Sequence, residues 1–240
     1  MSSRRHRPGW SFGALALAAS FAIGGCGTSG GLPVGGEPTT QVSAPASSAS
    51  DSTCPTTQPA ALAAGQTKTV TITTPKGTIV IKVDGGLAPI ATGNFVALAA
   101  CGYYTGVVFH RLVPGFVIQG GDGQYGRVGA DGKLSASDAT QVGSGGPGYT
   151  IADDPVTTSY VRGTVAMART SDPHSQGSQF FIVLDNAAAQ SLSQANDYAI
   201  LGNVTSGMDV VDAIAALPNS GDPNNKANDP IPMTSVTVGP

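Results

Sequence analysis

Residues 109–122, with the sequence FHRLVPGFVIQGGD, constrain the fold of this chain more than any other stretch. They form two short β-like runs that place one permanent cation, Arg111, and one amide among apolar side chains. Successive side chains of a β-strand point to opposite faces, so Val117 and Gln119 share a face of their run. The stretch therefore predicts paired strands that present polar groups beside an apolar surface.

A second run repeats this arrangement further along the chain. Residues 177–182, GSQFFI, place Gln179 and Phe181 on one face of a strand. An amide beside an apolar side chain suits a proline ring lying next to a polar peptide bond. Taken alone, Arg111 could equally be a surface residue and the phenylalanines ordinary core, but two such segments in this order favour a binding site.

The two segments together closely resemble the signature of the cyclophilin peptidyl-prolyl cis/trans isomerases, and the resemblance covers about residues 66–240. Residues 168–175 are similar to the bacterial branch in particular. Other matching segments follow in the family's order: Asn94-Phe95-Val96-Ala97-Leu98, Gly102-Tyr103-Tyr104, Gly146-Pro147-Gly148-Tyr149, Val165-Ala166-Met167-Ala168-Arg169 and Leu201-Gly202-Asn203-Val204.

The resemblance implies an enzyme that accelerates rotation about X-Pro bonds and needs no cofactor. That rotation is slow because the C–N bond is partly double, with a barrier of about 18–20 kcal/mol. Arg111 is the implied catalytic residue, since a guanidinium that donates to the prolyl nitrogen would stabilise the twisted state. The implied substrate-binding residues are Phe116, Val117, Gln119, Ala168, Arg169, Gln179, Phe181, Leu192 and Tyr198.

Several positions depart from the family pattern at the rim of the implied pocket. Trp10 is the only tryptophan of the chain, so the rim tryptophan common in eukaryotic members is absent. Tyr198 stands where many members have a rim histidine, and Leu201 replaces the usual phenylalanine. We therefore expect weaker cyclosporin binding than in eukaryotic cyclophilins, whereas the residues implied in catalysis are unchanged.

The distribution of apolar residues agrees with a mainly β fold, a closed antiparallel β-barrel with two flanking α-helices. Residues 67–73 and 78–83 are rich in β-formers and predict a hairpin around a Pro-Lys-Gly turn. Apolar spacing predicts amphipathic helices over about 91–98 and 210–217. Residues 120–148 are rich in Gly, Ser and Asp and predict a long irregular loop, and 231–238 predict a closing strand.

The first 25 residues are typical of a secretory signal peptide. Three arginines precede the apolar run 10–23, which is shorter than the ~20 residues that a bilayer core requires. Small residues directly before Cys26 resemble a bacterial lipobox, in which the cysteine carries lipid such as palmitate. A plain cleaved signal with an incidental cysteine is the alternative. The main prediction is an exported protein, lipid-anchored on the extracytoplasmic face of the cell membrane.

Residues 26–65 predict a flexible tether between that lipid anchor and an isomerase domain over 66–240. The segment is rich in Gly, Ser, Thr, Ala and Pro and offers few large apolar side chains to offset its ordering entropy. Cys54 and Cys101 remain after Cys26, and in an oxidising compartment they either form a disulfide or stay reduced. The sequence leaves both options open.

The net charge and the positions of the histidines narrow the classes of ligand and partner that this protein can bind. The formal charge of −3 includes three arginines of the signal, so the mature chain is near −6, which argues against nucleic acid as a partner. The three histidines have no metal-ligand spacing, and we expect no metal site; His110 is interpreted as a packed or hydrogen-bonded strand residue. The expected partners are proline-containing polypeptides, bound by a monomer.

Two functions fit these features. The main hypothesis is an isomerase that acts as a foldase on unfolded, exported polypeptides. The alternative is a catalytically weak proline-peptide binding module or chaperone on the cell surface. An intact Arg111 beside an intact pocket favours the enzyme.

Overall fold

The structure is a computed structural model that describes residues 53–240. The predicted signal peptide 1–25, the lipidation site Cys26 and the tether up to residue 52 lie outside the described residues. None of the helices within 53–240 is long and apolar enough to span a membrane.

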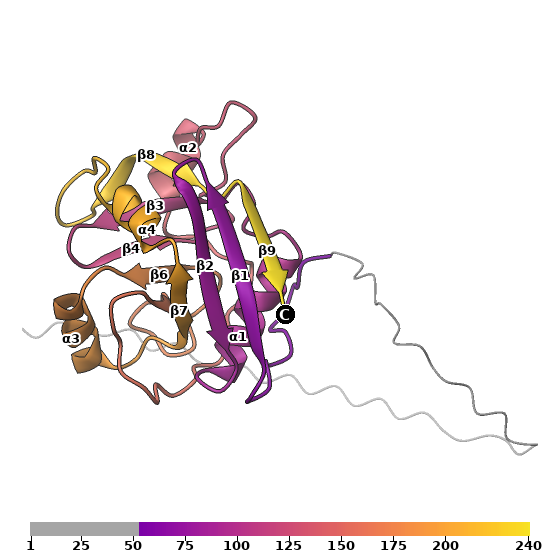
Figure 1. Cartoon of the computed structure of the whole chain (residues 1–240). Coiled ribbons are helices and arrows are strands. Elements are labelled where there is room, and N and C mark those ends of the chain that lie inside the picture. The colour runs from indigo at the N-terminus through magenta and orange to yellow at the C-terminus, as the bar shows by residue number, and fades with distance from the viewer. Residues whose placement is uncertain (1–52) are drawn as a thin grey trace, which may run out of the picture. The chain divides into compact units, whose positions relative to one another are not determined.

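A curled, fully antiparallel sheet of nine strands forms the body of the molecule (Figure 1). Its hydrogen-bonded order is β8-β3-β4-β6-β5-β7-β2-β1-β9. The strands are β1 Thr67–Thr74, β2 Gly77–Asp84, β3 Val108–Val113, β4 Val117–Gly120, β5 Thr164–Met167, β6 Phe180–Val183, β7 Ile200–Ser206, β8 Lys226–Pro232 and β9 Ser235–Gly239. The mainly β prediction is confirmed.

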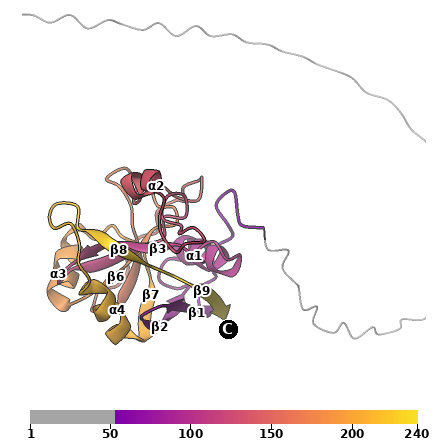
Figure 2. The ribbon, with the colours of Figure 1, turned by 90° about the horizontal axis from the view of Figure 1, so that it is seen from above.

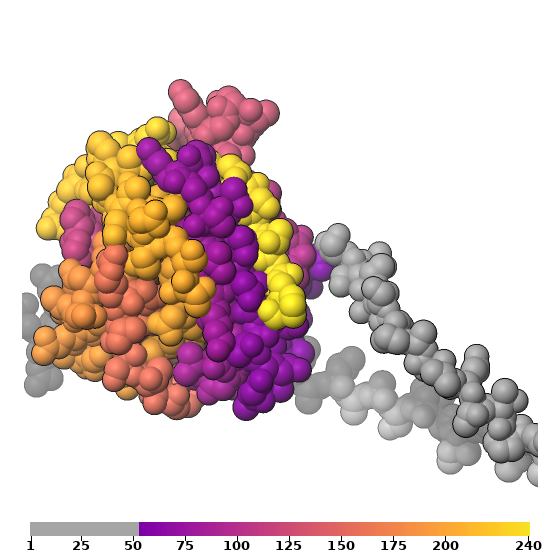
Figure 3. All heavy atoms as spheres, viewed as in Figure 1, coloured from indigo at the N-terminus to yellow at the C-terminus, as the bar shows by residue number. Residues whose placement is uncertain are grey.

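Closure of the barrel is not confirmed by the strand pairing. Strands β8 and β9 stand at the two ends of the order, and among the described residues no ladder joins them. They are consecutive in sequence, so the two edges of the curled sheet are linked through Met233 and Thr234. On one face of the molecule, the β1–β2 hairpin and β9 lie side by side (Figure 3).

Four helices accompany the sheet in the described part of the chain, where the sequence predicted two. These are α1 Pro89–Ala100, α2 Ala136–Gln141, α3 Asn186–Ala195 and α4 Met208–Ala215. Helices α1 and α4 confirm the two predicted segments. Helix α2 lies within the predicted irregular loop and stands away from the sheet (Figures 1 and 2). Helix α3 was not predicted, because Leu192 is the only large apolar residue in its Ala- and Ser-rich sequence.

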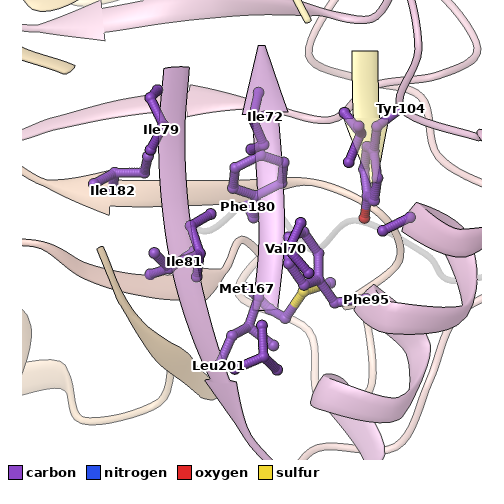
Figure 4. Close-up of a cluster of buried hydrophobic side chains, with 14 of the residues drawn as sticks. Val70, Ile72, Ile79, Ile81, Phe95, Tyr104, Met167, Phe180, Ile182 and Leu201 are labelled. Atoms are coloured by element: carbon purple, nitrogen blue, oxygen red, sulfur yellow. The ribbon is translucent and has the colours of Figure 1, made fainter. Parts of the chain in front are cut away.

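The main core lies inside the curl of the sheet, where α1 covers it. Phe95 of α1 packs edge-on against Phe180 of β6, with ring centroids 5.2 Å apart, and Tyr104 lies 5.4 Å from Phe95. All three side chains are buried (Figure 4). Strand residues Val70, Ile72, Ile79 and Ile81 belong to the same cluster.

A second apolar cluster occupies the opposite face of the sheet, beneath α3. Because side chains alternate along a strand, neighbouring residues of β6 are divided between the two clusters: Phe180 belongs to the inner one and Phe181 to the outer one. Leu192 of α3 packs into the outer cluster together with Val117 of β4. The outer face of the sheet therefore has an apolar surface of its own.

The predicted boundary between tether and domain, at residue 66, is placed too late. A disulfide joins Cys54 to Cys101 at the end of α1, with 5.2 Å between the Cα atoms. The backbone N–H of Leu62 donates to the Pro89 carbonyl oxygen at 2.9 Å, and the Leu62 side chain is buried. Covalent and hydrogen bonds thus hold residues 54–65 on the domain despite their polar, proline-rich composition.

Candidate active site

A pocket of about 160 Å³ opens on the outer face of the sheet and brings together every predicted catalytic and substrate-binding residue except Gln179. Its walls come from β3, β4, β6 and α3 and from the segments around 168 and 198. The lining consists of Arg111, Phe116, Val117, Gln119, Ala168, Arg169, Phe181, Leu192 and Tyr198.

Strand register arranges the centre of the pocket as a row across the sheet. Arg111 of β3 pairs with Gln119 of β4, which pairs with Phe181 of β6, which in turn pairs with Ala166 of β5. Directly paired residues of antiparallel strands project from the same face. The row therefore places the guanidinium, the amide and the aromatic ring side by side.

A bulge in β3 turns Arg111 toward this row. Phe109 pairs with Gly120 and Arg111 with Gln119, so β3 has one residue more than β4 between these pairs. Strict alternation would put Phe109 and Arg111 on the same face, but Phe109 lies in the inner core while Arg111 lines the outer pocket. The extra residue, His110, shifts the alternation of side chains by one position, so Arg111 projects from the outer face.

A chain of hydrogen bonds orients the polar side chains. Arg111 Nη1 donates to Gln119 Oε1 at 3.3 Å, and Gln119 Nε2 donates to Gln179 Oε1 at 2.9 Å. Gln179 Nε2 in turn donates to the carbonyl oxygens of Gly143 at 3.0 Å and Gly145 at 2.8 Å. No carboxylate of the described chain pairs with Arg111, so most guanidinium donors stay free for a substrate.

Packing and hydrogen bonds hold the apolar wall in place. Phe181 is 4% exposed and stacks edge-on against Tyr198, with centroids 5.4 Å apart. The hydroxyl of Tyr160 accepts from the Tyr198 backbone N–H at 3.1 Å and donates to the Tyr198 carbonyl oxygen at 2.8 Å. Burial raises the pKa of Tyr160 to about 12, so this hydroxyl keeps its proton at neutral pH. The backbone N–H and the carbonyl oxygen of Tyr198 are therefore both fixed by the Tyr160 hydroxyl.

Gln179 lies in a longer groove of about 830 Å³ that shares Gln119, Ala168 and Arg169 with the pocket. The guanidinium of Arg169 is occupied by the protein itself: Nη1 lies 3.3 Å from Asp153 Oδ2, and Nη2 donates to the Asp172 carbonyl oxygen at 3.0 Å. The backbone of Arg169, rather than its side chain, is left to contact a ligand in the groove.

The sequence analysis missed Asp122 and the loop that this residue holds. The buried carboxylate accepts hydrogen bonds from four backbone N–H groups, two through each oxygen: Oδ1 from Gln124 and Tyr125, and Oδ2 from Gly143 and Gly145. This places residues 143–149 along the groove, where Gly143 and Gly145 receive the Gln179 amide. The sequence signal that could have revealed it is a single aspartate that follows the predicted strand and precedes a Gly-rich loop.

The family is shown by sequence comparison. The family model of the cyclophilin type peptidyl-prolyl cis-trans isomerases matches residues 69–238. The chain belongs to the cyclophilin family. It is accordingly a peptidyl-prolyl cis/trans isomerase, like the relatives that follow.

Several similar proteins are bacterial peptidyl-prolyl cis-trans isomerases. Peptidyl-prolyl cis-trans isomerase A of Dickeya dadantii is 36% identical over 181 residues, covering 74% of this chain and 88% of that protein. A peptidyl-prolyl cis-trans isomerase of Acinetobacter baylyi is 38% identical over 165 residues, covering 68% of this chain and 80% of that protein.

Solved structures show the same fold. The crystal structure of a Cryptosporidium parvum cyclophilin type isomerase aligns with a TM-score of 0.59 and 29% identity, over 73% of this chain and 99% of that one. A crystal structure of the C. parvum isomerase in the presence of the dipeptide Ala-Pro aligns with a TM-score of 0.58 and 30% identity, over 72% and 99% of the two chains. The curled antiparallel sheet is thus cyclophilin-like.

His110, the bulge residue of this cyclophilin, is packed as expected but has no hydrogen-bond partner at either ring nitrogen. Burial lowers the pKa of His110 to about 4, against a smaller opposing effect of Asp122. The ring is therefore neutral at physiological pH. Among the described residues, no group of three His, Cys, Asp or Glu side chains is placed to hold a metal ion.

Proposed function

We propose that Arg111 catalyses rotation of an X-Pro bond whose proline ring lies in the outer-face pocket. The observation that supports this is the position of a half-buried guanidinium, hydrogen-bonded to one amide, at the edge of a pocket walled by Phe181 and Leu192. The C–N bond loses its double-bond character in the twisted state, and the nitrogen lone pair becomes a hydrogen-bond acceptor. A cation that donates to this nitrogen stabilises the transition state more than either ground state.

The remaining pocket residues hold the substrate in place. The apolar wall takes the proline ring, and Tyr198 closes the rim with its aromatic face. Gln119 and Gln179, connected by a hydrogen bond, offer amide groups to the peptide on either side of the proline. Gln119 also fixes the direction of the guanidinium, so Arg111 needs little reorganisation when the bond twists.

Substitution of Arg111 tests the mechanism. Arg111→Ala should lower the isomerisation rate about a hundredfold or more, as the loss of one transition-state donor does, with little loss of peptide binding. Arg111→Lys should restore only part of the rate, because an ammonium keeps the charge without the planar set of donors. Exchange NMR on one X-Pro peptide reports both quantities, and circular dichroism checks the fold.

Nearly full isomerisation by a folded Arg111→Ala variant would refute the proposed role of this residue. A wild-type protein that binds the peptide without accelerating its exchange would instead support the binding-module alternative.

We also propose that the enzyme is a foldase for exported polypeptides, attached to the cell membrane through lipid on Cys26 and active as a monomer. The basic start, the short apolar run and the small residues before Cys26 support this proposal. Expressed in a bacterium and fed radiolabelled palmitate, the wild-type chain should take up label and enter the detergent phase. Equal labelling of a Cys26→Ser variant would contradict the anchor.

A further inference from the structure

A second cavity, of about 430 Å³, adjoins the proline pocket at Arg111 and the long groove at Gly143 and Ser144. Arg111 and Gln119 line both cavities, so the two are continuous at the catalytic side chain. Lys226, the first residue of β8, forms part of the far wall. Its role is not explained by the binding of a proline ring.

Strand register sets Lys226 directly beside Arg111. The two residues are paired across β3 and β8, and Arg111 is paired with Gln119 on its other side. Strands β3 and β8 are adjacent in the sheet (Figure 2). Lys226 thus extends the row of the active site by one position. Two like charges directly opposite each other on neighbouring strands destabilise a sheet.

No acidic side chain neutralises this pair. None of the residues that line the cavity is an aspartate or a glutamate, and within residues 53–240 neither cation is in a salt bridge. The neighbouring carboxylate, Asp122, is buried, and both of its oxygens accept hydrogen bonds from backbone N–H groups. Lys226 Nζ donates to the Thr140 carbonyl oxygen at 3.3 Å, which leaves two of its three donors free.

We propose that this cavity is a subsite for an acidic side chain of the substrate, and that Lys226 is a specificity-determining residue of the isomerase. The inference rests on the proposed binding of the X-Pro bond in the adjoining pocket. Each residue of an extended peptide spans about 3.3–3.6 Å, so an aspartate or glutamate one or two positions from the proline reaches a cavity that begins at Arg111. Lys226 binds the carboxylate, and Arg111 stays directed at the prolyl nitrogen.

Lys226 is partly exposed to solvent, and this limits how strongly it can favour a peptide that carries a carboxylate. Exposed or half-exposed ion pairs contribute modestly, so we expect a preference of about two- to fivefold for a peptide with glutamate over the same peptide with glutamine. Added salt should reduce this preference, because the screening length falls from about 10 Å at 0.1 M to about 3 Å at 1 M.

The test compares kcat/KM on paired X-Pro peptides that carry glutamate or glutamine at one of four positions, the two before and the two after the proline. Wild-type protein should favour the glutamate peptide at one or more positions. Lys226→Gln should bring that ratio to about one, and Lys226→Arg should keep it. Lys82→Gln, which removes the same formal charge from an exposed position on β2, is the control and should keep the wild-type ratio.

Equal rates on each wild-type pair, or an unchanged ratio in Lys226→Gln, would overturn the subsite. An equal loss of the ratio in Lys226→Gln and Lys82→Gln would overturn it too, because overall charge would then explain the preference. Turnover of the glutamine peptides by wild-type protein separates these outcomes from a failure of the proposed catalytic site, in which neither peptide is isomerised.

Discussion

Arg111 reaches the active site because β3 contains one residue more than its partner strand. The alternation of apolar and polar residues in the sequence predicted two strands here, and it placed Val117 and Gln119 on a common face. It could not place Arg111, because period-2 alternation assigns Arg111 and Phe109 to the same face. The bulge at His110 depends on tertiary pairing, which a single strand sequence does not encode.

The buried His110 should make the fold sensitive to mild acid. Its pKa is about 4 in the folded protein, whereas an unfolded histidine takes its proton near pH 6.5. Between these values the unfolded chain binds more protons, so stability falls as the pH drops from about 6.5 toward 4, by on the order of 3 kcal/mol in all. Urea denaturation across this range measures the slope, and an NMR titration of the ring gives the pKa directly.

A His110→Gln variant provides the comparison for this prediction, because glutamine does not titrate. Its free energy of unfolding should change less between pH 6.5 and 5 than that of the wild type. Parallel slopes for the two proteins would show that other groups cause the acid sensitivity.

Phe181 and Phe180 are adjacent in sequence yet should respond differently to substitution. Phe181→Ala empties the wall of the proline pocket and should weaken peptide binding and isomerisation together, since the ring is held in both ground and transition states. Phe180→Leu, in the inner core, should lower the free energy of unfolding while peptide affinity stays near that of the wild type. Exchange NMR and urea denaturation on both variants check this; equal effects on binding would contradict it.

At the level of elements, strands and the two strongly apolar helices were predictable, whereas α3 was not. The hairpin β1–β2 and helices α1 and α4 follow from apolar spacing and turn chemistry. Helix α3 has mostly small or polar residues, and its start is fixed by the Asp185 side chain, which accepts from the Ala188 N–H at 2.7 Å. Leu192 was nevertheless assigned to the pocket, through family resemblance rather than through any helical pattern.

The close contact of β7 with β2 should make the fold sensitive to a side chain at Gly202. Gly202 of β7 lies so close to β2 that an added Cβ would overlap the carbonyl oxygen of Lys82, which is backbone and cannot move aside. Gly202→Ala should therefore destabilise the fold by about 1–3 kcal/mol, the usual cost of overpacking. Gly239→Ala on β9, where the nearest atoms are 3.8 Å away, is the matched control and should have little effect in thermal unfolding.

For the whole molecule, the sequence predicted which residues lie together in one pocket better than it predicted where the domain begins. Low apolar content suggested a tether up to residue 65, but the structure attaches the chain to the domain from Cys54 onward. Composition describes what a segment can bury by itself, and it takes no account of a covalent bond to a distant residue. The state of Cys54 and Cys101 could not be decided from their spacing alone.

Removal of the disulfide should lower the stability of the entire domain. Cys54 and Cys101 are 47 residues apart, and closing a loop of that length stabilises a protein by about 4 kcal/mol in the chain-entropy model, with 2–4 kcal/mol typical of measurements. A Cys54→Ser/Cys101→Ser variant should lose this amount in urea denaturation. Wild-type protein in reductant should match the variant, and a stability that reductant leaves unchanged would indicate free thiols.

The two-sided sheet separates what keeps the molecule folded from what it does to a substrate. Phe180, Phe95 and the inner strand residues can be held constant by selection for stability, while outer positions that flank the catalytic Arg111, such as Lys226, can vary under selection for peptide preference. Substitutions that lie far apart in the two clusters should have additive effects on stability. Such a scaffold suits laboratory evolution: a library that keeps Arg111 and varies its neighbours on the outer face would sample new peptide specificities while the inner core keeps the protein folded.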